Sequence, residues 1–301
     1  MNDGVIVHGI DNLNSYYDPS LKQKRLDQLQ SHQNFSFNKL DICISSELNK
    51  IFEDFKPQKV VNLAAQAGVR YSLENPQPYI KSNLVGFMNI LECCRHYDIE
   101  GLIYASSSSV YGGNEKIPFS VVDRVDRPIS IYGVTKKSNE LMAYSYSHLF
   151  GLHITGLRFF TVYGPWGRPD MVMYIFADKI LKGEPISVFN HGKMERDFTY
   201  IDDIIAGLRI AIEKNYPCEI FNLGNNNSEN LMTMVRLIES EIGKKAEIQF
   251  EGMQAGDLKR TFADIEHSKQ KLNYNPTTRI VEGIPKFIDW FKKYKVNTYN
   301  T

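Results

Sequence analysis

The sequence predicts an α/β protein with a doubly wound parallel sheet and a smaller α/β second lobe. In the first half, short apolar runs alternate with longer amphipathic segments, which is typical of strands and the crossover helices between them. Beyond Tyr163 this alternation gives way to the turn-rich stretch YGPWGRPD and a mixture of shorter elements. No linker or repeat interrupts the chain, so we expect the two lobes to pack together around a cleft.

The individual elements follow from apolar runs, caps and breakers. Pro76 is a good opening residue for a long helix, and Ser130 can cap the N-terminus of another. The expected strands are VIVHGI, FSFNKLD, KVVNLAA, LIYASSS and HITGLRFF, and the expected helices cover residues 20–31, 46–55, 76–96, 130–150 and 171–181.

Composition narrows the classes of partner. Lys plus Arg and Asp plus Glu both number 35, so no excess positive charge attracts nucleic acid or a membrane surface. The chain has no apolar run of about 20 residues and no basic leader, and we expect a cytoplasmic protein. The four cysteines lack metal-ligand or disulfide spacing, so we expect no metal site.

Polar residues follow several predicted strands. In doubly wound sheets, ligands bind beyond the carboxyl ends of the strands. The strand-end positions here are Asp11, Asp41, residues 64–67, residues 106–109 and Thr161. Each of them, taken alone, has a second interpretation as a turn-forming residue.

One helical pair suggests chemistry. Tyr132 and Lys136 are four residues apart on the helix predicted over residues 130–150, so their side chains share one face. An ammonium group there would lower the phenol pKa from about 10 and make Tyr132 a general base. Chance is the alternative in a chain with 17 tyrosines, but Tyr132 is the only one followed by lysine at this spacing.

Four longer motifs carry a family resemblance. The segments ASSSSVYG, PISIYGVTKKSNELMA, LRFFTVYGPWGRPDM and RDFTYIDDI occur in this order, and the resemblance runs from about Gly9 to about Trp290. They resemble the extended short-chain dehydrogenase/reductase family, within it the NAD-dependent epimerases and dehydratases, and most closely the UDP-glucuronate 4-epimerases. The resemblance implies that Tyr132 takes the proton from the sugar 4-hydroxyl, that Ser107 binds the same hydroxyl, and that Lys136 binds the nicotinamide ribose.

The resemblance also implies a reaction and a substrate. Related dehydratases carry an Asp-Glu pair where this chain has Ser108 and Ser109, which favours epimerisation. A guanidinium at Arg168 suits a sugar carboxylate, although a surface turn arginine is the alternative. Neutral-sugar epimerases that act on UDP-glucose or UDP-N-acetylglucosamine remain the near alternative, and a non-catalytic binder of nucleotide sugars is another. The implied substrate-binding residues are Ser108, Thr161, Arg168, Arg196 for the diphosphate, and Asp257 for the ribose or the second-lobe arginines.

The implied cofactor is NAD. A carboxylate at Asp11 can accept hydrogen bonds from the adenosine ribose, and no neighbouring positive charge offers a site for a 2′-phosphate. The implied cofactor-binding residues are Asp11, Asn12, Asp41, Ile42, Ala64, Ala65, Gln66, Asn83, Tyr132 and Lys136.

The family pattern implies a strand and a glycine-rich turn before VIVHGI, and neither is present. The missing strand belongs at the centre of the sheet, so its two neighbours should each have an unpaired edge. We therefore expect a truncated chain, with a start assigned too far downstream, that binds NAD poorly and has little epimerase activity. We expect residues 1–164 to form a Rossmann-like NAD-binding domain that is incomplete at its N-terminus. Residues 165–301 should form mainly a substrate-binding lobe, with residues 197–224 returning to the sheet. We also expect a homodimer through the helices over residues 76–96 and 130–150.

Overall fold

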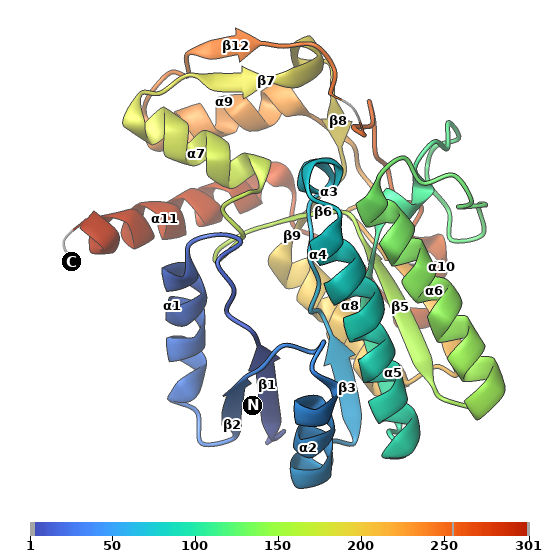
Figure 1. The fold of residues 1–301 in the computed structure, drawn as a ribbon. Coiled ribbons are helices and arrows are strands. Elements are labelled where there is room, and N and C mark those ends of the chain that lie inside the picture. The colour runs from blue at the N-terminus through green and yellow to red at the C-terminus, as the bar shows by residue number, and fades with distance from the viewer. Residues whose placement is uncertain (1–3, 255, 300–301) are drawn as a thin grey trace.

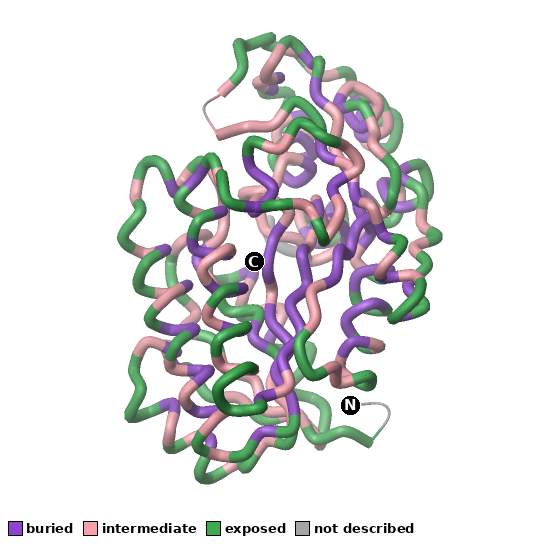
Figure 2. The backbone as a smooth tube through the Cα atoms, turned by 90° about the vertical axis from the view of Figure 1, so that its right-hand side faces the viewer, coloured by how far each residue is buried: buried purple, intermediate pink, exposed green. Residues whose placement is uncertain are grey.

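The computed structural model describes residues 4–254 and 256–299 and confirms the α/β fold class. Helices flank parallel strands in the lower part of Figure 1, and a smaller layer of helices and short strands lies above them. In Figure 2 buried segments run through the interior of the larger part, with more exposed segments around them.

The longer parallel strands of the larger lobe lie in two separate sheets. Strands β1 (Val7–Asp11) and β2 (Phe35–Lys39) pair with each other. The second sheet has the order β10-β5-β4-β3, with β3 at Lys59–Asn62, β4 at Gly101–Ser107, β5 at Ile154–Phe159 and β10 at Cys218–Leu223. Within the described residues, β1 and β3 each pair with a strand on one side only.

The helices of the larger lobe begin and end largely where their caps predict. They are α1 (Pro19–Gln30), α2 (Ser45–Phe55), α5 (Phe87–His96), α6 (Ile131–Phe150) and α8 (Ile201–Lys214). The Asp18 side chain accepts a hydrogen bond from the backbone N–H of Ser20, and Ser130 accepts one from Gly133. Gly151 ends α6 in the left-handed conformation.

The helix expected over residues 76–96 is not uniform. It consists of α4 (Gln77–Tyr79), a π-helical segment η1 (Ile80–Gly86) and then α5. π-helical turns are rare and occur frequently at functional sites. Here the segment contains the buried Asn83, whose contacts are described below.

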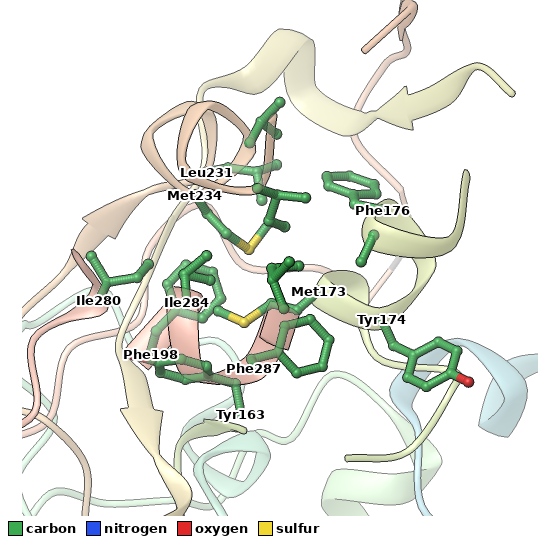
Figure 3. Packing of buried hydrophobic residues seen from close by; sticks show 14 of the residues in the cluster. Tyr163, Met173, Tyr174, Phe176, Phe198, Leu231, Met234, Ile280, Ile284 and Phe287 are labelled. Atoms are coloured by element: carbon green, nitrogen blue, oxygen red, sulfur yellow. The ribbon is translucent and has the colours of Figure 1, made fainter. Parts of the chain in front are cut away.

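The smaller lobe has a core of its own, shown in Figure 3. Helices α7 (Val172–Lys182), α9 (Leu231–Ile242) and α11 (Ile280–Tyr299) pack apolar side chains such as Phe176, Met234 and Phe287 against one another. The short strands β7 (Ile186–Val188) and β12 (Ile248–Phe250) form a parallel pair over them.

The remaining short elements of the two lobes are α3 (Val69–Glu74), η2 (Ser108–Tyr111), β6 (Thr161–Tyr163), η3 (Phe189–Gly192), β8 (Glu195–Arg196), β9 (Phe198–Tyr200), β11 (Glu229–Asn230) and α10 (Glu266–Leu272).

The chain returns from the smaller lobe to the large sheet. Strand β10 pairs in parallel with β5, and the preceding helix α8 contacts β4 and β5. This arrangement supports our division into residues 1–164 and 165–301, with residues 197–224 returning, which we retain as a proposal.

Candidate active site

The carboxyl end of β4 and the first turn of α6 bring the predicted catalytic side chains together. Ser107 ends β4, and its hydroxyl accepts a 3.1 Å hydrogen bond from the backbone N–H of Ser109. Lys136 is buried, and its ammonium donates a 2.7 Å hydrogen bond to the carbonyl oxygen of Ala105. Tyr132 lies one turn before Lys136 on α6 and close enough to Ser107 for their hydroxyls to interact.

Burial dominates the ionisation of Tyr132. It raises the pKa of the phenol above its ordinary value, and the carboxylate of Asp170 raises it further. The guanidinium of Arg168 and the hydroxyl of Ser107 act in the opposite direction. A positive charge does therefore lower the phenol pKa in this structure, but it is the charge of Arg168.

The lowering of the Tyr132 pKa by Lys136 stays a prediction. Burial lowers the pKa of the Lys136 ammonium itself to about 8, and its hydrogen bond goes to Ala105. Near neutral pH the Lys136 ammonium is therefore still mostly charged.

Hydrogen bonds of Asn83 connect the loop before α3 to helix α6. Its side chain accepts a 2.8 Å hydrogen bond from the backbone N–H of Gln66 and donates to the Gln66 carbonyl and to Thr135. Asn139 donates a 2.6 Å hydrogen bond to the Asn83 carbonyl. The amide therefore holds the loop in register with the helix that carries Tyr132.

A buried ionic network underlies α6. The guanidinium of Arg158 on β5 makes two hydrogen bonds, of 2.8 and 2.9 Å, with the carboxylate of Glu140. Glu140 also accepts a hydrogen bond from Ser106, and Arg158 donates one to Tyr111. Burial works against both charges, but the pairing lowers the pKa of Glu140 overall and raises that of Arg158. Both groups thus stay charged, and they link the strands to the helix.

Two of the predicted substrate-binding residues, Thr161 and Arg168, lie beside a small cavity at the start of the smaller lobe. Thr161, Arg168 and Met171 line it together with residues of α7 and α11. The Arg168 guanidinium contacts the Asp170 carboxylate at 3.0 and 3.1 Å. Ser108 follows Ser107 in η2 and is half-buried.

Two arginines and one carboxylate lie together at the predicted diphosphate position. Asp257 contacts Arg70 of α3 at 3.1 Å, so its ion-pair partner comes from the first lobe. Burial lowers the pKa of Arg196, Asp257 raises it, and Arg70 lowers it. The pKa effects place all three charges close enough to interact, with two positive charges against one negative.

The predicted adenosine-binding residues lie at the ends of β1 and β2. Asp11 accepts a 2.7 Å hydrogen bond from the backbone N–H of Leu13, and Asn12 donates to Asp41 at 3.4 Å. Ile42 is buried in the core, so its side chain serves packing. Ala64 is exposed, and Ala65 is half-buried in the loop after β3.

These residues suit a dinucleotide. The exposed Asp11 and half-buried Asp41 offer carboxylate acceptors for ribose hydroxyls, and Lys136 offers a buried donor beside Tyr132.

Comparison with known proteins decides the family. The model of the NAD dependent epimerase/dehydratase family matches residues 1–224. The chain belongs to this family. Membership confirms the resemblance stated above, the enzyme class and NAD as the family's cofactor.

Members of the epimerase/dehydratase family resemble the chain over nearly its whole length. UDP-glucuronate 4-epimerase 4 of Arabidopsis thaliana is 45% identical over 97% of this chain and 70% of its own length. The crystal structure of UDP-glucuronic acid 4-epimerase from Bacillus cereus, in complex with UDP-glucuronic acid and NAD, has a TM-score of 0.90 at 34% identity, covering 97% of this chain and 93% of that one. UDP-glucose 4-epimerase from Thermotoga maritima with UDP-glucose has a TM-score of 0.89 at 29% identity, covering 98% and 93%.

Three residues near the candidate site were not predicted from the sequence. Arg70, Asp170 and Tyr16 stand in loops or at the start of a short helix, where no periodic pattern marks them.

Over the described part of the chain, no helix is long and apolar enough to cross a membrane, and no cluster of three potential metal-ligating side chains occurs.

Proposed function

We propose that the protein is a UDP-sugar 4-epimerase that interconverts UDP-glucuronate and UDP-galacturonate. The observation that carries this proposal is the proximity of three groups: the Tyr132 phenol, the Ser107 hydroxyl and the Arg168 guanidinium. The first two suit proton transfer at a sugar hydroxyl, and the third suits a sugar carboxylate.

In the proposed reaction, Tyr132 accepts the proton of the sugar 4-hydroxyl and later returns it. Ser107 holds the same hydroxyl, because its own hydroxyl ends β4 within hydrogen-bonding reach of the phenol. Bound NAD supplies the reversible oxidation at sugar carbon 4. Turning the sugar over between the two halves of the reaction requires a firm grip on the nucleotide. We assign this grip to Arg196 and to Arg70, whose charge acts on Arg196.

The same chain would hold NAD through groups at the sheet edge. Asp11 and Asp41 are suited to the adenosine ribose, and Lys136 to the nicotinamide ribose. Gln66, fixed by Asn83, would line the path of the pyrophosphate.

The absence of acidic side chains next to Ser107 favours epimerisation over elimination of water. The following residues, Ser108 and Ser109, are serines and cannot supply the additional acid and base that dehydration needs. Arg168 and Thr161 at the cavity favour a uronate, whereas the similarity to a UDP-glucose 4-epimerase supports a neutral sugar as the second candidate.

The test is a product assay with purified protein, saturating NAD and UDP-glucuronate, followed by NMR. Any epimerised product should be UDP-galacturonate, and Tyr132→Phe should lower its rate of formation by about 10²- to 10⁴-fold. Tyr97→Phe, at the end of α5, is the matched control and should keep the rate. Equal turnover of UDP-glucose by wild type and Arg168→Ala, with no turnover of the uronate, would favour the neutral-sugar candidate.

We also propose a homodimer formed through α5 and α6. These neighbouring helices carry exposed apolar side chains, including Met88, Leu141 and Tyr144. Sedimentation velocity should show a dimer that Leu141→Asp converts to monomers, whereas Leu29→Asp on α1 should leave it intact. A monomeric wild-type protein would contradict the proposal.

A further inference from the structure

Arg168 is held along one edge of its guanidinium. Nε and Nη2 donate to Oδ1 and Oδ2 of Asp170 at 3.0 and 3.1 Å. Nη1 donates to no protein group within the part of the chain that the structure describes. A planar fork fixed on its Nε side keeps its other nitrogen for a second acceptor.

Asp170 is held in turn by a residue from the other lobe. The hydroxyl of Tyr16, in the loop between β1 and α1, donates a 3.2 Å hydrogen bond to Asp170 Oδ2. Burial, and then the negative charge of Asp170, raise the pKa of Tyr16 to about 12. Tyr16 therefore remains a proton donor to Asp170 throughout the neutral range.

The meeting of Tyr16 and Asp170 depends on a glycine. A Cβ atom at Gly68 would lie 3.1 Å from the Tyr16 hydroxyl oxygen and 3.7 Å from Asp170 Oδ2. The Tyr16 ring packs against Tyr71 with a centroid distance of 5.0 Å, which fixes its direction. The loop after β3, the loop after β1 and the Arg168 loop thus converge at one point.

The pair lies close to the reacting end of the site. Arg168 and Asp170 both act on the Tyr132 pKa, in opposite directions. The Tyr132 ring also packs edge-on against Tyr79 at 6.1 Å, and the Tyr79 hydroxyl donates a 2.6 Å hydrogen bond to the Gly68 carbonyl. A sugar that approaches Tyr132 therefore comes near Arg168 as well.

We propose that Tyr16 and Asp170 are positioning residues that hold Arg168 ready for a sugar carboxylate and so set the preference of the site for uronates. This inference rests on the proposed function. Ordering a long arginine side chain costs binding free energy, and a guanidinium that is already ordered avoids most of that cost. Because Tyr16 belongs to the lobe with the predicted cofactor residues, the preference also depends on the contact between the two lobes.

Tyr16→Phe tests the inference without changing any charge. Calorimetric titrations with NAD in the buffer compare UDP-glucuronate, UDP-glucose and UDP. We expect Tyr16→Phe to weaken UDP-glucuronate binding by about 3- to 10-fold and to leave UDP-glucose and UDP unchanged. Tyr97→Phe should change none of the three.

A double-mutant cycle with Arg168→Ala identifies the route of the effect. If Tyr16 acts through Arg168, Tyr16→Phe should have no further effect in the Arg168→Ala protein. The same loss in both backgrounds, or equal losses for all three ligands, would overturn the positioning role while the proposed substrate stands. A wild-type protein that binds UDP-glucose as tightly as UDP-glucuronate, with Arg168→Ala silent, would overturn the proposed substrate and this inference with it.

Discussion

The ammonium group of Lys136 donates its 2.7 Å hydrogen bond to the carbonyl oxygen of Ala105, in the interior of the protein. The contact ties α6 to β4 directly behind Ser107. It also removes a charge from water, which is why burial lowers the pKa of Lys136 to about 8. The position therefore costs stability.

Lys136→Met should stabilise the protein near pH 7. Lowering a lysine pKa from 10.5 to about 8 costs the wild type about 3 kcal/mol of stability at neutral pH. Methionine removes this cost but leaves the Ala105 carbonyl without its donor, which costs about 1 kcal/mol, so the variant should gain about 2 kcal/mol. In the wild type the cost of burying the charged Lys136 is complete below about pH 8. It decreases as the pH rises and is absent above pH 10.5. Urea unfolding should accordingly show the advantage of Lys136→Met shrinking from pH 8 to pH 10. A variant less stable than wild type at pH 7 would contradict this account.

Arg158→Met should destabilise the protein strongly. Arg158 and Glu140 are both almost fully buried, so removing Arg158 leaves the Glu140 carboxylate with only Lys137, 3.4 Å away, as a charged partner. The expected loss is about 3–5 kcal/mol in the free energy of unfolding. The exposed pair Lys293 and Asp289 provides the control, since Lys293→Met should cost less than about 1 kcal/mol. Equal losses of unfolding free energy for the two variants would contradict this prediction and would show that the Glu140 carboxylate becomes hydrated when Arg158 is removed.

Gly133→Ala should disturb the active site although it adds one methyl group. A Cβ atom at Gly133 would lie 2.6 Å from the backbone oxygen of Ser109, so α6 and η2 would have to move apart. We expect at least a 10-fold drop in epimerase rate, because small displacements of reacting groups are costly. Gly113→Ala is the matched control, since its nearest neighbour would be 3.7 Å away. A normal rate in Gly133→Ala would mean that the strand end tolerates movement.

Most of the sheet could be predicted because buried parallel strands are short apolar runs whose ends carry the polar residues. The same rule placed Ser107 at a strand end, and helical spacing placed Tyr132 beside Lys136. The bond between Tyr16 and Asp170 could not be predicted, because it joins two loops 154 residues apart and neither loop has a periodic pattern. Nor could the dominance of burial over charge at Tyr132 be predicted, since it depends on the packing of the folded chain.

Asp197 should make the stability of the protein fall as pH rises. Its carboxylate is fully buried and accepts hydrogen bonds from the backbone N–H groups of Asn225 and Ala263 and from the Thr199 hydroxyl. Burial nevertheless dominates and raises the pKa of Asp197 from 3.8 to about 6. Between these two values the folded protein binds the proton more tightly than the unfolded chain, so the contribution to stability is complete below pH 3.8 and is lost as pH rises through 6.

Comparison with Asp197→Asn separates this group from every other carboxylate in the protein. Asparagine does not titrate, so the difference in unfolding free energy between wild type and variant isolates Asp197. Relative to Asp197→Asn, the wild type should lose up to about 3 kcal/mol of unfolding free energy as the pH is raised from 4 to 7. Chemical unfolding at several pH values measures it. A difference that stays constant over this range would show that the backbone hydrogen bonds outweigh burial and keep Asp197 ionised throughout.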